Sequence, residues 1–318
     1  MKVRVLISNV LVALLIAGCG GGGDSTSPPP DHALVWSTVP SGTSQVLFGV
    51  WGTSPSDVWA VGIGSVLHYN GSTWSSLSIG ASQVAYGVWG TSPTDVWVVG
   101  NDGTPLHYDG TNWARGATLP MLSLQRLWGT SPSNVWAVGQ HGTVLHYDGT
   151  SWSSISTGAA QSNWFFGVWG SSASDVWVVG YDDNPDPLSR VAVMYHYDGA
   201  TWSNVDVHIA EGFLGVWGTS ASDVWVVGNG GIIMHYNGTQ WTSVSTPTTK
   251  NLHAVWGTSA TDVWAVGHLT TILHYDGTHW STVKSETTDI LLDVWGSSAT
   301  NLWSVGTAGT ILHAATSP

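Results

Sequence analysis

Residues 49–62 read GVWGTSPSDVWAVG, and residues 87–100 repeat them almost unchanged as GVWGTSPTDVWVVG. Five weaker copies follow along the chain. Aligned on the first tryptophan of this stretch, the copies are separated by 38, 39, 41, 48, 39 and 39 residues, at Trp51, Trp89, Trp128, Trp169, Trp217, Trp256 and Trp295. A repeat of this length is typical of the four-stranded blades of a β-propeller.

Each copy contains four short segments bounded by turn residues. In the third copy they are RLWG from Arg126, NVWAVG from Asn134, TVLHYDG from Thr143 and SWSSIS from Ser151. Segments of four to seven residues, rich in Val, Trp and Tyr and separated by Gly, Ser-Pro and Asp-Gly, indicate strands joined by hairpins. The sequence therefore predicts an all-β chain of four-stranded antiparallel blades.

The two ends of the array predict that the ring closes on itself. The last copy stops at TILHAATSP and lacks a fourth segment, while an orphan fourth segment, LVWSTVP, occupies residues 34–40. An unpaired edge strand promotes aggregation, and a blade built from both termini removes that edge. We predict a seven-bladed β-propeller over residues 34–318, in which the N-terminal strand completes the last blade.

The repeated aromatic residues are expected to hold the blades together. Of the 22 tryptophans, 21 occupy three repeat positions, on the first, second and fourth segments, where large side chains can fill the gaps between blades. Seven histidines recur on the third segment, and we expect each to bond the Asp or Asn that opens the second segment of its own blade. These histidines are His68, His107, His146, His196, His235, His274 and His313.

The N-terminus reads as a targeting segment. Residues 1–18 run from a basic start through an apolar stretch too short to span a bilayer, which predicts a signal peptide. IAGC, ending at Cys19, resembles the lipobox of bacterial lipoproteins, whose cysteine is lipidated. Residues 19–33, rich in Gly, Ser and Pro, are expected to be a flexible tether. The resemblance implies an envelope protein anchored through Cys19, at the outer membrane or cell surface.

Composition excludes several functions. Charged residues make up 8% of the chain and the formal net charge is −13, so the scattered Lys and Arg cannot neutralise a nucleic acid backbone. Cys19 is the only cysteine, so the folded part has neither disulfides nor thiol chemistry. No phosphate loop or catalytic motif rises above the repeat, and the sequence predicts no cofactor and no enzyme.

The repeat consensus DVWAVGxxGTxLHYDGxxW resembles tectonin-type propellers. It is also similar to photosystem-assembly-factor and Asp-box propellers, although the Asp-box is incomplete because Asp148 and Gly149 are adjacent. The resemblance covers residues 34–318, and in the third copy its residues include Val135, Trp136, Gly142 and Tyr147. Likeness to tectonin-type propellers implies a lectin, that is, a glycan-binding protein.

Sequence differences between the copies fall on one face of the ring, where second segments connect to third ones and each blade connects to the next. The variable connections are residues 77–86, 114–125, 153–166, 204–214, 243–253 and 282–292. The fourth copy also has an enlarged acidic loop, YDDNPDPLSR, at residues 181–190, and the one tryptophan outside the repeat, Trp164. An aromatic face beside carboxylates suits a sugar or peptide. The predicted ligand-binding residues are Trp164, Phe165, Tyr181, Asp182, Asp183, Asp186, Arg190 and Arg126.

Two further expectations concern charged residues. Asp182, Asn184 and Asp186 have the alternate spacing of calcium ligands, but the Gly and distal Glu of a calcium loop are missing, so no metal site is predicted. Arg126 and Asp293 replace a small residue before the repeated Val or Leu, and are expected either to line the axial channel or to be a solvated ion pair or simple loop charges.

We therefore expect a monomeric, lipid-anchored binding module whose first candidate ligand is a glycan. The alternatives are a scaffold for envelope or extracellular proteins, using the same face, and an enzyme with residues gathered at the channel mouth. Membrane contact is expected only through Cys19.

Overall fold

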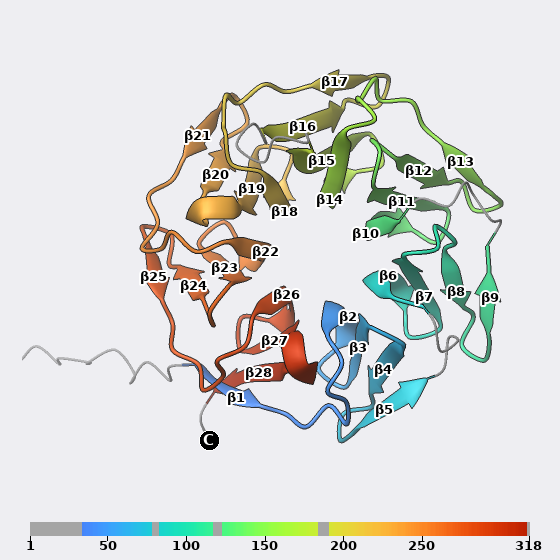
Figure 1. Ribbon diagram of the computed structural model, residues 1–318, viewed down its shortest axis with the longest axis vertical. Helices are drawn as coiled ribbons and strands as arrows, with labels where there is room; N and C mark the ends of the chain where they lie inside the picture. Colours follow the sequence, from blue (N-terminus) through green and yellow to red (C-terminus); the bar gives the residue numbers. More distant parts are fainter. Residues whose placement is uncertain (1–33, 78–82, 117–122, 184–190, 317–318) are drawn as a thin grey trace, which may run out of the picture. The chain divides into compact units, whose positions relative to one another are not determined.

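The computed structural model describes residues 34–77, 83–116, 123–183 and 191–316. Within these ranges the chain forms seven four-stranded antiparallel sheets. The sheets stand around a common centre as the blades of a propeller, with the first strand of each innermost and the fourth at the outer edge (Figure 1). The predicted seven-bladed β-propeller is thus confirmed.

Blades are numbered 1 to 7 along the chain. Their first strands are β2 (Leu47–Ser54), β6 (Ala85–Ser92), β10 (Leu124–Ser131), β14 (Asn163–Ser172), β18 (Phe213–Ser220), β22 (Leu252–Ser259) and β26 (Leu291–Ser298). The second strands are β3 (Asp57–Gly62), β7 (Asp95–Gly100), β11 (Asn134–Gly139), β15 (Asp175–Asp182), β19 (Asp223–Gly228), β23 (Asp262–Gly267) and β27 (Asn301–Gly306).

The outer half of each blade is shorter. The third strands are β4 (Ser65–Tyr69), β8 (Leu106–Tyr108), β12 (Val144–Tyr147), β16 (Ala192–Tyr197), β20 (Ile233–Tyr236), β24 (Ile272–Tyr275) and β28 (Ile311–Thr316). The fourth strands are β5 (Trp74–Leu77), β9 (Trp113–Arg115), β13 (Trp152–Ser154), β17 (Trp202–Asn204), β21 (Trp241–Ser243), β25 (Trp280–Thr282) and β1 (Leu34–Thr38). In the described ranges the 3-10 turns η2 (Asn229–Gly231) and η3 (Thr307–Gly309) follow second strands. No helix in the described ranges is long and apolar enough to cross a membrane.

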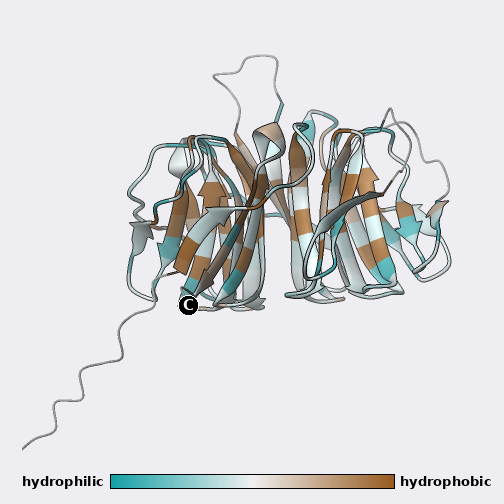
Figure 2. Ribbon diagram, turned by 90° about the horizontal axis from the view of Figure 1, so that it is seen from below, coloured by the Kyte–Doolittle hydropathy of each residue, from teal (hydrophilic) through white to brown (hydrophobic). Residues whose placement is uncertain are grey.

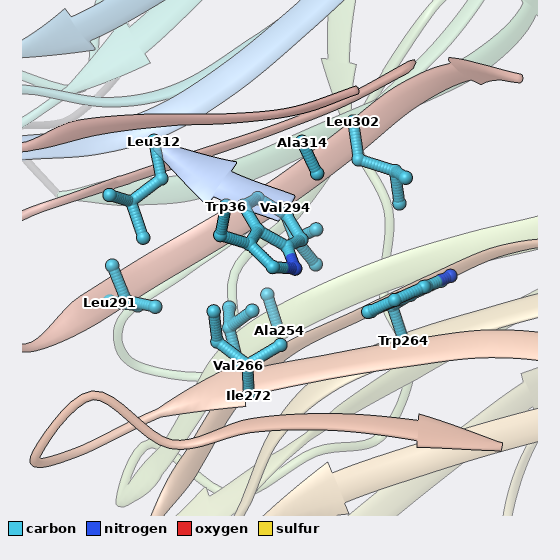
Figure 3. Packing of buried hydrophobic residues seen from close by; sticks show 10 residues of the cluster. All are labelled: Trp36, Ala254, Trp264, Val266, Ile272, Leu291, Val294, Leu302, Leu312 and Ala314. Carbon is cyan, nitrogen blue, oxygen red and sulfur yellow. The ribbon is translucent and has the colours of Figure 1, made fainter. Parts of the chain in front are cut away.

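Strand β1 closes the ring by pairing with β28, from Leu34 opposite Thr316 to Thr38 opposite Leu312. Trp36 is 1% exposed and packs among Leu312, Ala314 and side chains of blade 6 (Figure 3). The N-terminal strand therefore completes blade 7, as the orphan segment predicted. Seen edge-on, the strands of the blades nearest the viewer carry hydrophobic stretches (Figure 2).

Tryptophans join each blade to the next. At every junction the second-strand Trp of one blade meets the fourth-strand Trp of the following blade edge to face, with ring centroids 5.2–6.0 Å apart. Such pairs contribute about 0.5–1.5 kcal/mol beyond the area they bury. First-strand tryptophans are half-buried and lie against a glycine of the following blade.

Each repeated histidine is held inside its own blade, as predicted. Its Nε2 lies 2.6–3.1 Å from the side chain of the Asp or Asn that opens the second strand. Its ring lies over the second-strand Trp, with centroids 4.1–4.3 Å apart. This repeated contact joins the second and third strands of every blade. Because it recurs in all seven blades, residues that distinguish one blade from another lie at other positions.

Candidate functional site

The candidate site is a cavity of about 580 Å3 at one end of the propeller axis, here called the funnel. It opens where the connections between blades arrive at the first strands, which is the face that carries the variable sequence. Its wall consists of Phe48, Tyr86, Gln125, Phe166, Leu214, His253 and Leu292, with Tyr181, Asn229 and Asn251 above them and Arg126 in the floor.

The seven wall residues occupy the same position in the seven blades. Each is the second residue of a first strand or, in the longer β14, the fourth, and each is half-buried. Propeller symmetry therefore brings seven equivalent positions into one ring, but the side chains are aromatic, aliphatic, amide and imidazole. The funnel is thus chemically asymmetric although the scaffold around it is nearly symmetric.

Two aromatic pairs stand on the funnel wall. Phe48 and Tyr86, from blades 1 and 2, meet edge to face with centroids 5.1 Å apart. Phe166 and Tyr181, both from blade 4, are stacked at 5.0 Å. Pairs of this kind present rigid apolar surface at low entropic cost, which suits the binding of an apolar or flat group.

Arg126 closes the floor of the funnel. One guanidinium nitrogen, Nη1, donates to the carbonyl oxygens of Tyr86 at 2.7 Å and Gln125 at 3.2 Å. The other, Nη2, has only long contacts, 3.3 Å to the Phe48 oxygen and 3.5 Å to the Leu292 oxygen. Arg126 therefore spans from blade 3 to blades 2, 1 and 7 and is enclosed by the ring, and is not a solvated surface charge.

Asp293 lies beneath Arg126 in a smaller chamber of about 130 Å3, which is otherwise lined mainly by first-strand Val, Trp and Gly residues. Its Oδ2 accepts the backbone N–H of Val50 in blade 1 and its Oδ1 that of Val294, both at 3.0 Å. Burial raises the pKa of Asp293, while the Arg126 charge and these hydrogen bonds oppose the rise. Arg126 and Asp293 therefore line the axial channel, which is one of the two expectations from the sequence.

His253 forms the blade 6 side of the wall. Its ring lies 4.9 Å from that of His268, and its Nε2 is buried without a hydrogen-bond partner among the described residues. Burial, and then the neighbouring His268 and Arg126, lower the pKa of His253 to about 4. At neutral pH His253 is therefore uncharged and lies near the permanent positive charge of Arg126.

The structure brings only part of the predicted site together. Tyr181 and Arg126 line the funnel. Phe165 is 0% exposed and packs in the core between blades 3 and 4, because the strand alternation that points Phe166 toward the axis turns Phe165 away from it. Phe165 thus belongs to the packing and Phe166 to the cavity wall.

The other predicted residues lie at the edge of blade 4. Trp164 is half-buried, pairs with Tyr181 across the ladder and lies with its ring 6.3 Å from that of Phe166. Asp182 and Asp183 follow at the end of β15, and Asp183 donates its backbone N–H to Ser162 at 2.7 Å. Asn184, Asp186 and Arg190, like Cys19, lie outside the described residues. The described residues contain no cluster of three side chains suited to a metal ion.

Most of the wall was missed by reasoning from motifs, although a signal was present. Six of the variable connections end at Tyr86, Gln125, Phe166, Leu214, His253 and Leu292, one residue before the repeated small or charged residue and the Val-Trp or Leu-Trp pair. This position differs between the copies, whereas the Trp that follows three residues later is the same in all of them. Such variation within a constant repeat indicates residues that serve ligand binding and not the packing of the blades.

A second cavity of about 630 Å3 lies at the junction of blades 3 and 4. Its walls include Trp136, His146, Tyr197 and Trp202, which are repeat residues with counterparts at the other junctions. A related cavity of about 240 Å3 lies between blades 2 and 3. Repeat residues form much of these grooves, but residues 155–158 and 114–116, from two variable connections, line them as well. The funnel differs in that a variable position of every blade contributes to its wall.

No family model and no curated protein matches the chain. Solved structures of similar shape include YCF48 bound to D1 peptide, with 16% identity over 89% of this chain and 97% of that one and a TM-score of 0.72. YCF48 from Cyanidioschyzon merolae has 16% identity, coverage of 88% and 99%, and a TM-score of 0.70.

Two further structures are similar in shape to this chain. The WD40 propeller domain of Doa1 has 11% identity, coverage of 88% and 96%, and a TM-score of 0.73. Streptogramin B lyase has 10% identity, coverage of 88% and 97%, and a TM-score of 0.73. Likeness at this identity concerns the fold alone, and by fold the chain is a β-propeller.

Proposed function

We propose that the protein is a binding module that takes a segment of another protein into the funnel. The observation that carries this proposal is the ring of seven chemically different side chains at one symmetric position. Repeat residues explain how the propeller holds together, but nothing in the scaffold requires Phe, Tyr, Gln, Phe, Leu, His and Leu at equivalent places. A concave site with mixed chemistry supports selective binding.

The size and lining of the funnel support a peptide segment as ligand. Its volume of about 580 Å3 falls in the range of small-ligand pockets and has room for a few side chains. Aromatic pairs offer apolar contact, while Gln125, Asn229 and Asn251 offer hydrogen bonds to a backbone. One structure of similar fold is described with a bound peptide, which shows that this architecture can serve such a role in that protein.

A glycan remains the second candidate, because Trp164 and Tyr181 supply aromatic faces beside the carboxylates of Asp182 and Asp183.

An enzyme would require titratable residues outside the repeat near the axis, and Arg126, His253 and Asp293 lie together there. Both oxygens of Asp293 already accept backbone N–H groups and Arg126 donates to carbonyls, so these two residues support the fold more directly than they support turnover.

We further propose that the propeller acts in a bacterial envelope, held by a lipid on Cys19 through the tether of residues 19–33. The lipobox-like IAGC and the Gly-rich run after it support this placement. Such an anchor would keep the funnel within reach of envelope or extracellular proteins.

Selection of a displayed peptide library on the full-length protein tests the proposal. Peptides selected by the native protein should lose binding to Leu214→Trp, which fills the funnel, and keep binding to Thr239→Trp, which lies in an exposed turn on the opposite face. Peptides that bind both variants equally would contradict the funnel as the site. A glycan array run in parallel decides the second candidate, which requires sugar binding that Trp164→Ala removes.

A further inference from the structure

The floor of the funnel carries a cationic side chain, and its wall carries a histidine, in an otherwise acidic protein. The chain has a formal net charge of −13 and seven Lys and Arg residues. One of them, Arg126, occupies the funnel floor, and the wall adds His253, with His268 against it. The ligand that complements this surface carries negative charge next to an apolar group, because the aromatic pairs occupy the remaining wall.

The neighbours of His253 in the described residues determine how it responds to such a ligand. His268, which follows β23, and Arg126, on β10, both lie near His253. Their charges disfavour a proton on His253. From β26, Asp293 lines the lower chamber with His253, but both of its oxygens are bonded to backbone N–H groups. The other packed elements, β18 and η2, contribute Leu214 and Asn229 to the wall, and neither side chain titrates.

Two nitrogen atoms of the funnel residues lack a close hydrogen-bond partner among the described residues. Nε2 of His253 is buried without any partner there, and once protonated and turned toward the cavity it would donate a hydrogen bond. Nη2 of Arg126 makes only the two long carbonyl contacts, so it can turn toward a closer and charged acceptor. A carboxylate between them would satisfy both groups.

We propose that the funnel binds a carboxylate of its partner together with a proton, which His253 takes up from solvent. This inference rests on the proposed function and names the chemistry of the bound segment: an acidic side chain or a chain-terminal carboxylate beside an apolar residue. The proton adds to Nε2, the resulting N–H donates to the carboxylate, and the ion pair offsets the cost of charging a buried imidazole. Affinity therefore increases as pH falls.

A carboxylate introduced into the wall tests the proton uptake without any ligand. Leu292 lies on β26, the first strand next to that of His253, and lines the same cavity. In Leu292→Asp the pKa of His253, followed by NMR of the imidazole, should rise by at least about one unit, a tenfold change in proton affinity. Leu292→Asn is the uncharged control and should leave it unchanged. Equal values in the two variants would overturn the coupling.

A matched pair of small probes tests the carboxylate. N-acetylphenylalanine carries an aromatic ring and a carboxylate, and N-acetylphenylalanine amide lacks only the charge. If binding raises the pKa of His253 by about one unit from its value of about 4, linkage predicts that the acid binds the native protein about twofold more tightly at pH 5 than at pH 8. The amide should show no such gain. Calorimetry in buffers of different ionisation enthalpy should show proton uptake with the acid. His253→Gln should abolish the pH dependence, while His208→Gln, at an exposed histidine, should retain it.

The outcomes separate this inference from the proposed function. Selected peptides that bind through the funnel with a flat pH profile, and without preference for acid over amide, would overturn the carboxylate and proton alone. If no peptide or probe binds through the funnel at any pH, the proposed function fails, and this inference fails with it.

Discussion

Each blade contains the same contact of three side chains: an Asp or Asn, a His and a Trp. The first of these, Asp or Asn, is the residue that differs between blades. In five blades the histidine bonds an Asp, as His68 bonds Asp57 at 2.7 Å, whereas blades 3 and 7 have Asn134 and Asn301. Burial tends to raise the pKa of Asp57, but hydrogen bonds from His68 and Thr53 outweigh it and the pKa is lowered. With an amide partner, burial lowers the pKa of His146.

At the residue scale we therefore predict that Asn134→Asp raises the pKa of His146. A His whose folded pKa lies below its unfolded value, as burial makes that of His146, destabilises the fold as pH falls through the unfolded pKa. Raising the folded pKa therefore restores stability at low pH and changes nothing at high pH. Because the pair is partly exposed, the gain should be modest, about 0.5–1 kcal/mol near pH 5 and absent near pH 9. Urea unfolding at both values measures it, and Asn134→Ser controls for loss of the amide. A gain of equal size at pH 9 would contradict the prediction.

At the scale of the element, the first strand contains a glycine whose role depends on the neighbouring blade. Its pattern predicted a strand, but the reason for the invariant Gly after Trp lies in the neighbouring blade. A Cβ on Gly218 would be 2.4 Å from the Asp223 carbonyl oxygen and 2.7 Å from the Trp169 ring of blade 4. A Cβ on each of the equivalent glycines would lie 2.6–2.8 Å from the Trp ring of the preceding blade. The glycine therefore lets neighbouring first strands approach, a contact that no single repeat contains.

We predict that Gly218→Ala destabilises the propeller by at least about 1–3 kcal/mol, the usual cost of overpacking a well-filled contact. Denaturant unfolding monitored by tryptophan fluorescence provides the measurement. Ser243→Ala, at an exposed position of β21 in the same blade, serves as control and should stay within about 0.5 kcal/mol of the native protein. Equal stability of the two variants would show that the blades can separate without cost.

For the whole molecule, closure could be predicted from the sequence and the funnel could not. Closure depends on two complementary ends, residues 34–40 and the incomplete last repeat, and both are visible in one dimension. The funnel depends on seven positions about 40 residues apart, none of which belongs to a motif. The motifs therefore indicated the enlarged loop after Tyr181, whereas His253 and Leu292, which line the same cavity, lie on other blades. Only the ring brings such positions together.

Closure by β1 also predicts how the whole ring resists unfolding. Val35 is exposed and lies opposite Ala315 in the ladder between β1 and β28, at a separation compatible with a disulfide. Oxidised Val35→Cys/Ala315→Cys, in a chain with Cys19→Ser, should gain about 2–5 kcal/mol, because the bond closes a loop of nearly the whole propeller. The reduced form of the same variant is the control, and unfolding midpoints of both forms give the difference. If oxidation leaves the midpoint unchanged, separation of β1 from β28 is not part of unfolding, and the seam between the termini is not where the ring opens.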